Sequence, residues 1–226
     1  MGSWSKTLAP LFIEFIGSIK EGDRVLDVGC GTGSLTFTIG DATKASTVVG
    51  IDTSVGYVQY ARAQNSHPHV AFEIGDAQKL PYDNGSFDCC VSSLMIQFVS
   101  DAHTATREMR RVTKKGGSVS TCVWDNSGGM ELSEKFWKAA VAVDSGAKRP
   151  RDRRYGSASA LSELWIATGF ANVETRALVI LMEFSSFDDF WSLLSNSQGP
   201  PKPYSSSLSE DRRQVLIEGA TTHRHS

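Results

Sequence analysis

Five short apolar runs recur along the first 125 residues, and amphipathic segments separate them. The runs are typical of strands buried on both faces and cover residues 25–28, 48–52, 70–74, 86–93 and 119–125. Helical periodicity is clearest in the segments 4–20, 55–64 and 101–112. Strand and helix thus alternate five times with short turns. This order predicts an α/β fold, with a doubly wound, mostly parallel sheet and helices on both faces.

The pattern changes after residue 125. It predicts helices at about 132–144, 158–168, 186–196 and 208–218, and a sixth strand at 173–184. The residues after Glu218 are too polar and too few for a buried central strand, so we expect six strands, no further one, and a loose C-terminal tail. We expect a single domain over 1–226, with an insertion at about 126–169 and a divergent helical C-terminus at 186–226.

The most informative stretch follows the first apolar run. Glycines then occupy every second position, at Gly29, Gly31 and Gly33, before Ser34 begins a helical pattern. A strand, a tight glycine turn and a helix N-terminus make a cradle in which a ligand lies against bare backbone. NAD-binding loops have a similar sequence, so the turn alone indicates only a nucleotide-like ligand.

Two residues argue against a dinucleotide. Ser34 stands where the dinucleotide fingerprint has its third glycine, and Asp27 places a carboxylate near the mouth of the turn. A negative charge there would repel a pyrophosphate but would attract a positively charged ligand. S-adenosylmethionine (SAM), which carries a sulfonium and an ammonium group, is such a ligand.

Polar residues recur at the ends of the other strands. Asp52, followed by Thr53, ends the second run nineteen residues after Gly33 and is suited to accept both hydrogen bonds of a ribose diol. Ser54 is the better N-cap for the following helix. The remaining strand ends carry Asp76, Ala77, Ser93 and Trp124. Because the carboxyl ends of parallel strands share one edge of a sheet, we expect these residues to form a single site.

The run Val25–Gly33, the acid Asp52 and the Gly75-Asp76-Ala77 motif resemble the motifs of class I SAM-dependent methyltransferases. The similarity is to the small-molecule branch, which resembles ubiquinone and menaquinone biosynthesis enzymes, and it covers roughly residues 4–204. It implies SAM as cofactor, with the adenine amine on Asp76 and a ring nitrogen on the Ala77 amide. It also puts 94–98 beside the methionine part of SAM. Gln97 would then bind the cofactor carboxylate or the acceptor, or would only cap a turn.

The same resemblance implies a lid. Trp4 would cover the cofactor, although Ser3 stands where that branch often has arginine, and the insertion would cover a small-molecule methyl acceptor. The aromatic residues expected at the acceptor are Trp124, Phe136, Trp137 and Tyr155. No catalytic residue is identified, because transfer from a sulfonium depends mainly on alignment and desolvation. A general base is needed only for a poorly acidic acceptor.

Composition limits the remaining possibilities. A net charge of −2 gives no general attraction to nucleic acid or to anionic membranes, and the chain has no run of eighteen apolar residues and no signal-peptide pattern. Four cysteines without a C-x-x-C spacing indicate reduced, buried thiols and no metal site. We therefore expect a cytoplasmic monomer or homodimer.

Two features leave alternatives open. Five basic residues between positions 148 and 154 favour a solvated loop over a site for an anionic substrate or RNA; they are Lys148, Arg149, Arg151, Arg153 and Arg154. A chain that binds SAM without transferring a methyl group is the alternative function. An NAD-dependent oxidoreductase is opposed by Asp27, Ser34 and Asp76.

Overall fold

The computed structural model describes residues 2–17, 19–43, 45, 47–147, 155–196 and 201–222. It divides the chain into two compact units: residues 1–124 with 154–180, and residues 125–153 with 181–226. The basic residues at 148–154 lie outside the described part of the chain, so their expected role stays a prediction.

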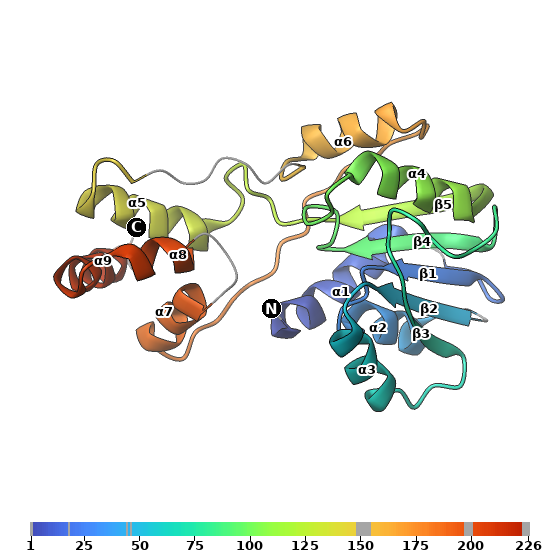
Figure 1. Ribbon diagram of the computed structural model, residues 1–226, viewed down its shortest axis with the longest axis horizontal. Coiled ribbons are helices and arrows are strands. Elements are labelled where there is room, and N and C mark those ends of the chain that lie inside the picture. The colour runs from blue at the N-terminus through green and yellow to red at the C-terminus, as the bar shows by residue number, and fades with distance from the viewer. Residues whose placement is uncertain are drawn as a thin grey trace. The chain divides into compact units, whose positions relative to one another are not determined.

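The first unit is built on a five-stranded sheet with the order β3-β2-β1-β4-β5, in which every pairing is parallel (Figure 1). Its strands are β1 (Arg24–Val28), β2 (Thr47–Asp52), β3 (Val70–Ile74), β4 (Phe87–Ser93) and β5 (Thr113–Cys122). The strand order reverses between β1 and β4, and such a switch point opens a crevice at the carboxyl ends of the strands. The doubly wound α/β fold is thereby confirmed.

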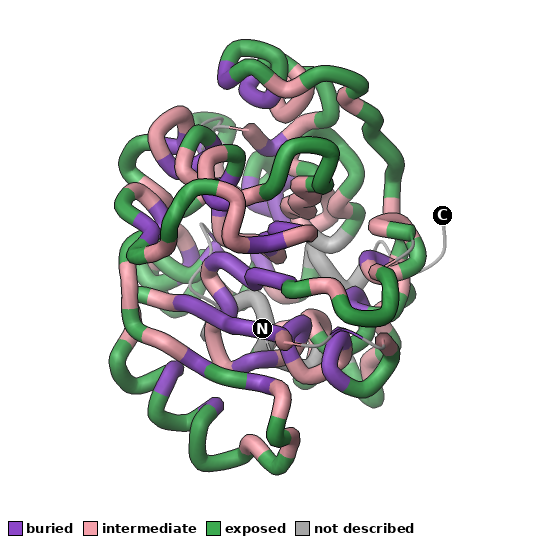
Figure 2. Tube along the Cα trace, turned by 90° about the vertical axis from the view of Figure 1, so that its right-hand side faces the viewer, coloured by how far each residue is buried: buried purple, intermediate pink, exposed green. Residues whose placement is uncertain are grey.

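Helices cover both faces of this sheet. They are α1 (Gly2–Ile16), α2 (Ser34–Ala42), α3 (Val55–Gln64), α4 (Ala102–Val112) and α6 (Ala158–Ala167). Successive residues of β1 enter different cores: Val25 packs with α1, α2 and α3, whereas Leu26 packs with α4 and α6. Figure 2 shows the resulting buried strands at the centre of this unit. Successive side chains of a strand point to opposite faces of the sheet, and both faces of β1 are covered by helices. This explains why the run of β1 is largely apolar.

Three expectations about this sheet need correction. Strand and helix do not alternate throughout, because residues 75–86 between β3 and β4 form a loop and contain no helix. The last strand begins at Thr113 and ends at Cys122, earlier than the expected 119–125. No sixth strand exists among the described residues: 173–184 has no strand pairing, and Val179 and Leu181 are 76% and 85% exposed.

The second unit is helical. It contains α5 (Glu131–Val143), α7 (Phe187–Asn196), α8 (Pro201–Ser207) and α9 (Glu210–Thr222). Its core gathers around Phe136, Trp137 and Leu216. The expected insertion is thus divided between the units, because α6 packs against α4 of the first unit. No residue beyond Glu218 forms a strand in the described part of the chain, as expected.

Candidate functional site

The glycine turn connects β1 to α2 and adopts backbone angles that favour glycine at all three positions. Gly29, Gly31 and Gly33 have φ values of +77°, +55° and +88°. The turn is tied to the next strand, since the amides of Gly29 and Cys30 donate to the Ile51 carbonyl at 2.7 and 3.1 Å. Left-handed angles explain the need for glycine here.

The surroundings of these glycines differ. A Cβ on Gly29 would lie 2.3 Å from Cγ of Met95, and one on Gly33 would lie 2.8 Å from the Phe37 ring. A Cβ on Gly31 would meet no atom within 4 Å among the described residues. Gly31 therefore exposes its backbone to open space, while its neighbours are packed, and the turn offers a ligand one accessible backbone segment.

Asp52 joins the turn to the end of β2. Its Oδ2 accepts a hydrogen bond from the Gly31 amide at 2.9 Å, and its Oδ1 accepts one from the Ser54 amide at 2.8 Å. A carboxylate has about four acceptor positions, so two remain for a ligand. Ser54, as expected, caps α3 by accepting from the Tyr57 amide. Thr53 between them is exposed.

Asp27 lies beneath the turn, with its side chain 1% exposed. Its Oδ2 accepts a hydrogen bond from the Thr36 hydroxyl at 2.7 Å, and its Oδ1 is buried and has no partner among the described atoms. Burial raises the pKa of Asp27 from 3.8 to about 7; the Thr36 hydrogen bond opposes this rise, and the Asp52 charge adds to it. A buried acceptor without a partner is costly unless a positive charge or a proton compensates it.

Asp76 and Ala77 begin the loop after β3. The Asp76 carboxylate accepts from the amide of Gln78 at 2.9 Å, which forms a local turn, and its side chain is exposed. Ala77 is buried. The side-chain amide of Gln78 also reaches Asp76, and it links this acid to the start of α4. No local pattern marks Gln78 as a site residue, because its contacts with Ser100 and Asp101 span more than twenty residues.

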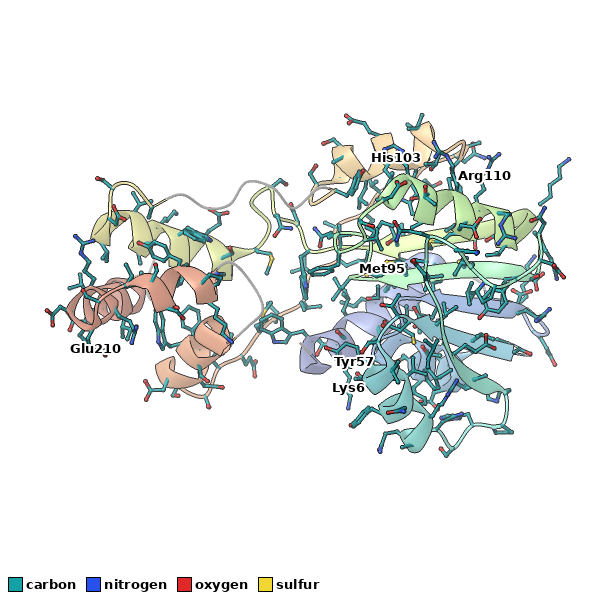
Figure 3. All side chains as sticks on the ribbon, viewed as in Figure 1. Lys6, Tyr57, Met95, His103, Arg110 and Glu210 are labelled. Carbon is teal, nitrogen blue, oxygen red and sulfur yellow. The ribbon has the colours of Figure 1, made fainter. Side chains whose placement is uncertain are left out.

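The loop after β4 contacts the glycine turn. Leu94 begins it with a positive φ of 59°, and its amide donates to the Cys122 carbonyl at 2.9 Å. Met95 then packs directly on Gly29, close to where β1 and β4 end (Figure 3). Ser93 lies beside Cys122, with 3.3 Å between Oγ and Sγ.

Gln97 is engaged by the backbone of Trp124. Its Nε2 donates to the Trp124 carbonyl at 3.2 Å, and its Oε1 accepts from the Trp124 amide at 3.3 Å. These two hydrogen bonds join the loop after β4 to the end of β5, and a role of Gln97 toward a ligand stays a prediction. The ring of Trp124 contacts that of Trp4 edge to face, with 5.8 Å between centroids. An aromatic pair thus lies at the end of β5.

The other expected lid residues pack within their own units. Phe136 and Trp137 are buried in the core of the helical unit, in edge-to-face contact with 5.2 Å between their centroids. Tyr155 belongs to the first unit and contacts His103 of α4. A role for these three side chains at an acceptor stays a prediction. No group of three potential metal ligands occurs in the described residues.

Comparisons with known proteins agree with this geometry. Residues 26–121 match a family model described as a methyltransferase domain. A demethylmenaquinone methyltransferase of Beutenbergia cavernae is 40% identical over 98 residues, which are 43% of this chain and 39% of that protein. A malonyl-[acyl-carrier protein] O-methyltransferase of Serratia marcescens is 34% identical over 104 residues, which are 46% of this chain and 39% of that protein.

The fold is also found among solved structures. A SAM-dependent methyltransferase of Aquifex aeolicus superimposes with a TM-score of 0.56 and 19% identity, covering 75% of this chain and 88% of that one. At this identity the similarity concerns the fold. Residues 26–121 thus match a methyltransferase domain model, and the sheet to which they contribute has a Rossmann-like fold. The chain spans less than half the length of the two relatives named above.

Proposed function

We propose that this chain is a SAM-dependent methyltransferase that acts on a small-molecule acceptor. The observation that carries the proposal is the hydrogen bond of 2.9 Å between the Gly31 amide and Asp52. It joins the open glycine turn and the acid at the end of β2 into one surface, at the strand ends where ligands bind to such sheets. The matching methyltransferase domain supports SAM as the ligand.

The side chains present fit SAM. Asp52 retains acceptor positions for the ribose hydroxyls, and the open space at Gly31 leaves room for the ligand along the turn. Asp76 provides an exposed carboxylate for the adenine amine. The unpartnered oxygen of Asp27 beneath the turn favours a ligand with positive charge. NAD, whose pyrophosphate is negative, is disfavoured by the same oxygen.

When bound, SAM supplies a methyl group on a sulfonium that leaves as a neutral thioether. The protein then has to align the acceptor and exclude water, which accounts for much of the catalysis in such transfers. Trp4 and Trp124 provide aromatic surface beside the carboxyl ends of the strands, as an apolar acceptor requires. The similarity to a demethylmenaquinone methyltransferase supports a small-molecule acceptor.

We further propose a cytoplasmic protein that is a monomer or homodimer, without nucleic acid as substrate. The net charge of −2 supports the absence of a nucleic-acid role. None of the described helices is both long and apolar enough to span a bilayer.

Calorimetry tests the cofactor. The chain is expected to bind one molecule of SAM or of S-adenosylhomocysteine and not to bind NAD. Asp52→Ala should lower the affinity at least tenfold, because a charge-assisted hydrogen bond contributes about 1.5–3 kcal/mol and 1.4 kcal/mol is a factor of ten. Asp41→Ala, which removes a surface acid that pairs with His67, is the matched control.

Transfer is tested with SAM labelled in its methyl group. Incubation with a cell extract should move the label to a small organic molecule. Equal SAM affinity of the wild type and of Asp52→Ala would refute the ribose assignment. Saturable SAM binding without any labelled product across extracts would favour the non-catalytic alternative. Tight, salt-sensitive binding of RNA would contradict the expected substrate class.

A further inference from the structure

The side-chain amide of Gln78 connects two parts of the site that are distant in sequence. Its Oε1 accepts hydrogen bonds from the Ser100 hydroxyl at 2.9 Å and from the Asp101 amide at 3.0 Å. Its Nε2 lies 3.3 and 3.4 Å from the two carboxylate oxygens of Asp76. One side chain therefore contacts both the loop after β3 and the N-terminus of α4.

The chemistry of the partners determines the orientation of this amide. A backbone N–H only donates, so the atom facing Asp101 has to be the oxygen. An ionised carboxylate only accepts, so the atom facing Asp76 has to be the nitrogen. Among the common side chains, only an amide offers an acceptor and a donor at this spacing. Glutamate would place a second carboxylate beside Asp76, and methionine would satisfy neither partner.

Both ends of this contact belong to elements that form the site. Asp101 is the N-cap of α4, and its side chain accepts from the Thr104 amide. The loop that ends at Asp101 begins with Leu94 and carries Met95, which packs on Gly29 of the glycine turn. The Gln78 amide therefore holds the position of that loop and the orientation of the Asp76 carboxylate at the same time.

We propose that Gln78 is a positioning residue of the cofactor site, which orients Asp76 toward the 6-amino group of adenine and ties it to the loop 94–101. This inference rests on the proposed function, because it acts through the contact between Asp76 and adenine. Without Gln78 the exposed Asp76 side chain would keep the backbone amide of its own turn as partner and lose the link to α4. Discrimination for the 6-amino group would then decrease.

The test uses two ligands that differ only at this group: S-adenosylhomocysteine and its analogue with hydrogen in place of the 6-amino group. Gln78→Met is expected to bind S-adenosylhomocysteine about five- to tenfold more weakly than the wild type. Its affinity for the analogue should change less than twofold. Gln64→Met, a change at an exposed glutamine at the end of α3, is the matched control and should alter neither affinity.

Two further variants separate positioning from a purely structural role. Gln78→Glu keeps the acceptor for Ser100 and Asp101 but adds a carboxylate beside Asp76. Its loss of affinity relative to the wild type should be at least tenfold, because two like charges then face each other. Ser100→Ala removes one hydrogen bond and should cost about twofold for S-adenosylhomocysteine, which keeps the test possible if Gln78→Met does not fold.

The outcomes distinguish this inference from the proposed function. Equal losses for both ligands in Gln78→Met, or no loss with either, would overturn the positioning role while leaving the proposed function intact. Equal wild-type affinity for the two ligands would overturn it as well, because Asp76 would then not read the amino group. Absence of any wild-type binding of S-adenosylhomocysteine would refute the proposed function itself.

Discussion

At the scale of single residues, two glycines have the same kind of backbone geometry, but only one of them lies in the proposed cofactor site. Gly31 and Gly22 both have positive φ angles, +55° and +86°, and neither would place a Cβ within 4 Å of a described atom. Gly22 precedes β1, on the far side of the strand from the glycine turn. The pair therefore separates the cost of backbone strain from the loss of ligand space.

We predict that Gly31→Val abolishes SAM binding and that Gly22→Val leaves it unchanged. Both variants should lose about 1–2 kcal/mol of unfolding free energy, because a branched residue at positive φ is strained. Both should keep the far-UV circular dichroism of the wild type. Calorimetry with SAM and urea unfolding measure the two effects separately. Normal SAM binding by Gly31→Val would mean that the turn is not the ligand cradle.

The raised pKa of Asp27 should make the stability of the protein depend on pH. Its folded-state pKa of about 7 is raised above 3.8, so the folded form holds a proton that the unfolded chain has already released. The stabilisation from this group is fully present below pH 3.8 and is lost as the pH rises through 7. Between pH 5 and pH 8 the unfolding free energy of the wild type should fall by about 3 kcal/mol because of this residue.

Asp27→Asn should remove this contribution, because the amide does not ionise. Urea unfolding at pH 5 and pH 8 is the measurement, and the difference between the two proteins isolates Asp27 from the other titrating groups. The same slope in both proteins would show that Asp27 is already ionised at pH 5. A positive ligand such as SAM should lower the pKa of Asp27, so that SAM binding releases protons near neutral pH.

At the scale of secondary structure elements, β5 is an open edge of the sheet. It pairs with β4 alone, and no described strand lies on its other side. Residues 114–118 are exposed and include Lys114 and Lys115. Lysines on an edge strand oppose pairing with other chains, because association would bury their charge. Lys114 is also paired with Asp88 at 2.7 Å, which leaves Lys115 for a mutational test.

We predict that Lys115→Ile increases self-association of the protein. The variant would present an apolar, β-branched side chain on an unpaired strand. Sedimentation velocity over a range of concentrations should show oligomers that the wild type lacks at the same concentrations. Lys138→Ile, on the exposed side of α5, adds the same side chain away from any sheet edge and serves as the control. Similar association of both variants would contradict the edge argument.

At the scale of the whole molecule, the chain builds two separate cores. Phe136, 0% exposed, is central to the helical unit, where its ring contacts those of Trp137, Trp191 and Tyr204 at 5.2–6.1 Å between centroids. The sheet unit has its own buried residues around β1 and β4. Each unit therefore has the packing needed to keep its own structure.

We predict that Phe136→Ala weakens the helical unit and leaves SAM binding within twofold of the wild type. Loss of a fully buried phenylalanine costs about 3–5 kcal/mol, which is enough to open a small helical core. Hydrogen exchange should increase in α5, α8 and α9 while β1 and β4 stay protected. A parallel loss of SAM affinity would show that the helical unit contributes to the cofactor site.

Much of the sheet unit follows from local sequence. The residues of β1, β2 and β3 are apolar runs between turns, and their bounds agree with the expected ones within one residue. The glycine turn follows β1, Asp27 and Asp52 are among the last two residues of their strands, and Asp76 comes two residues after β3, so the strand pattern places all of them. Such features depend on neighbours in the chain, and the side-chain period reports them.

Other features depend on contacts between distant residues. The segment 173–184 has a high β propensity, yet it forms no strand, because a strand exists only through its hydrogen-bonded partner. The hydrogen bonds of Gln78 with Ser100 and of Gln97 with Trp124 span more than twenty residues, and no local pattern marks them. Phe136 and Trp137 match an apolar pocket wall as well as a helical core. Local propensity and spacing thus determine which elements form. Strand pairing, packing and the partners of polar side chains depend on contacts between distant residues, and only the free energy of the complete fold decides them.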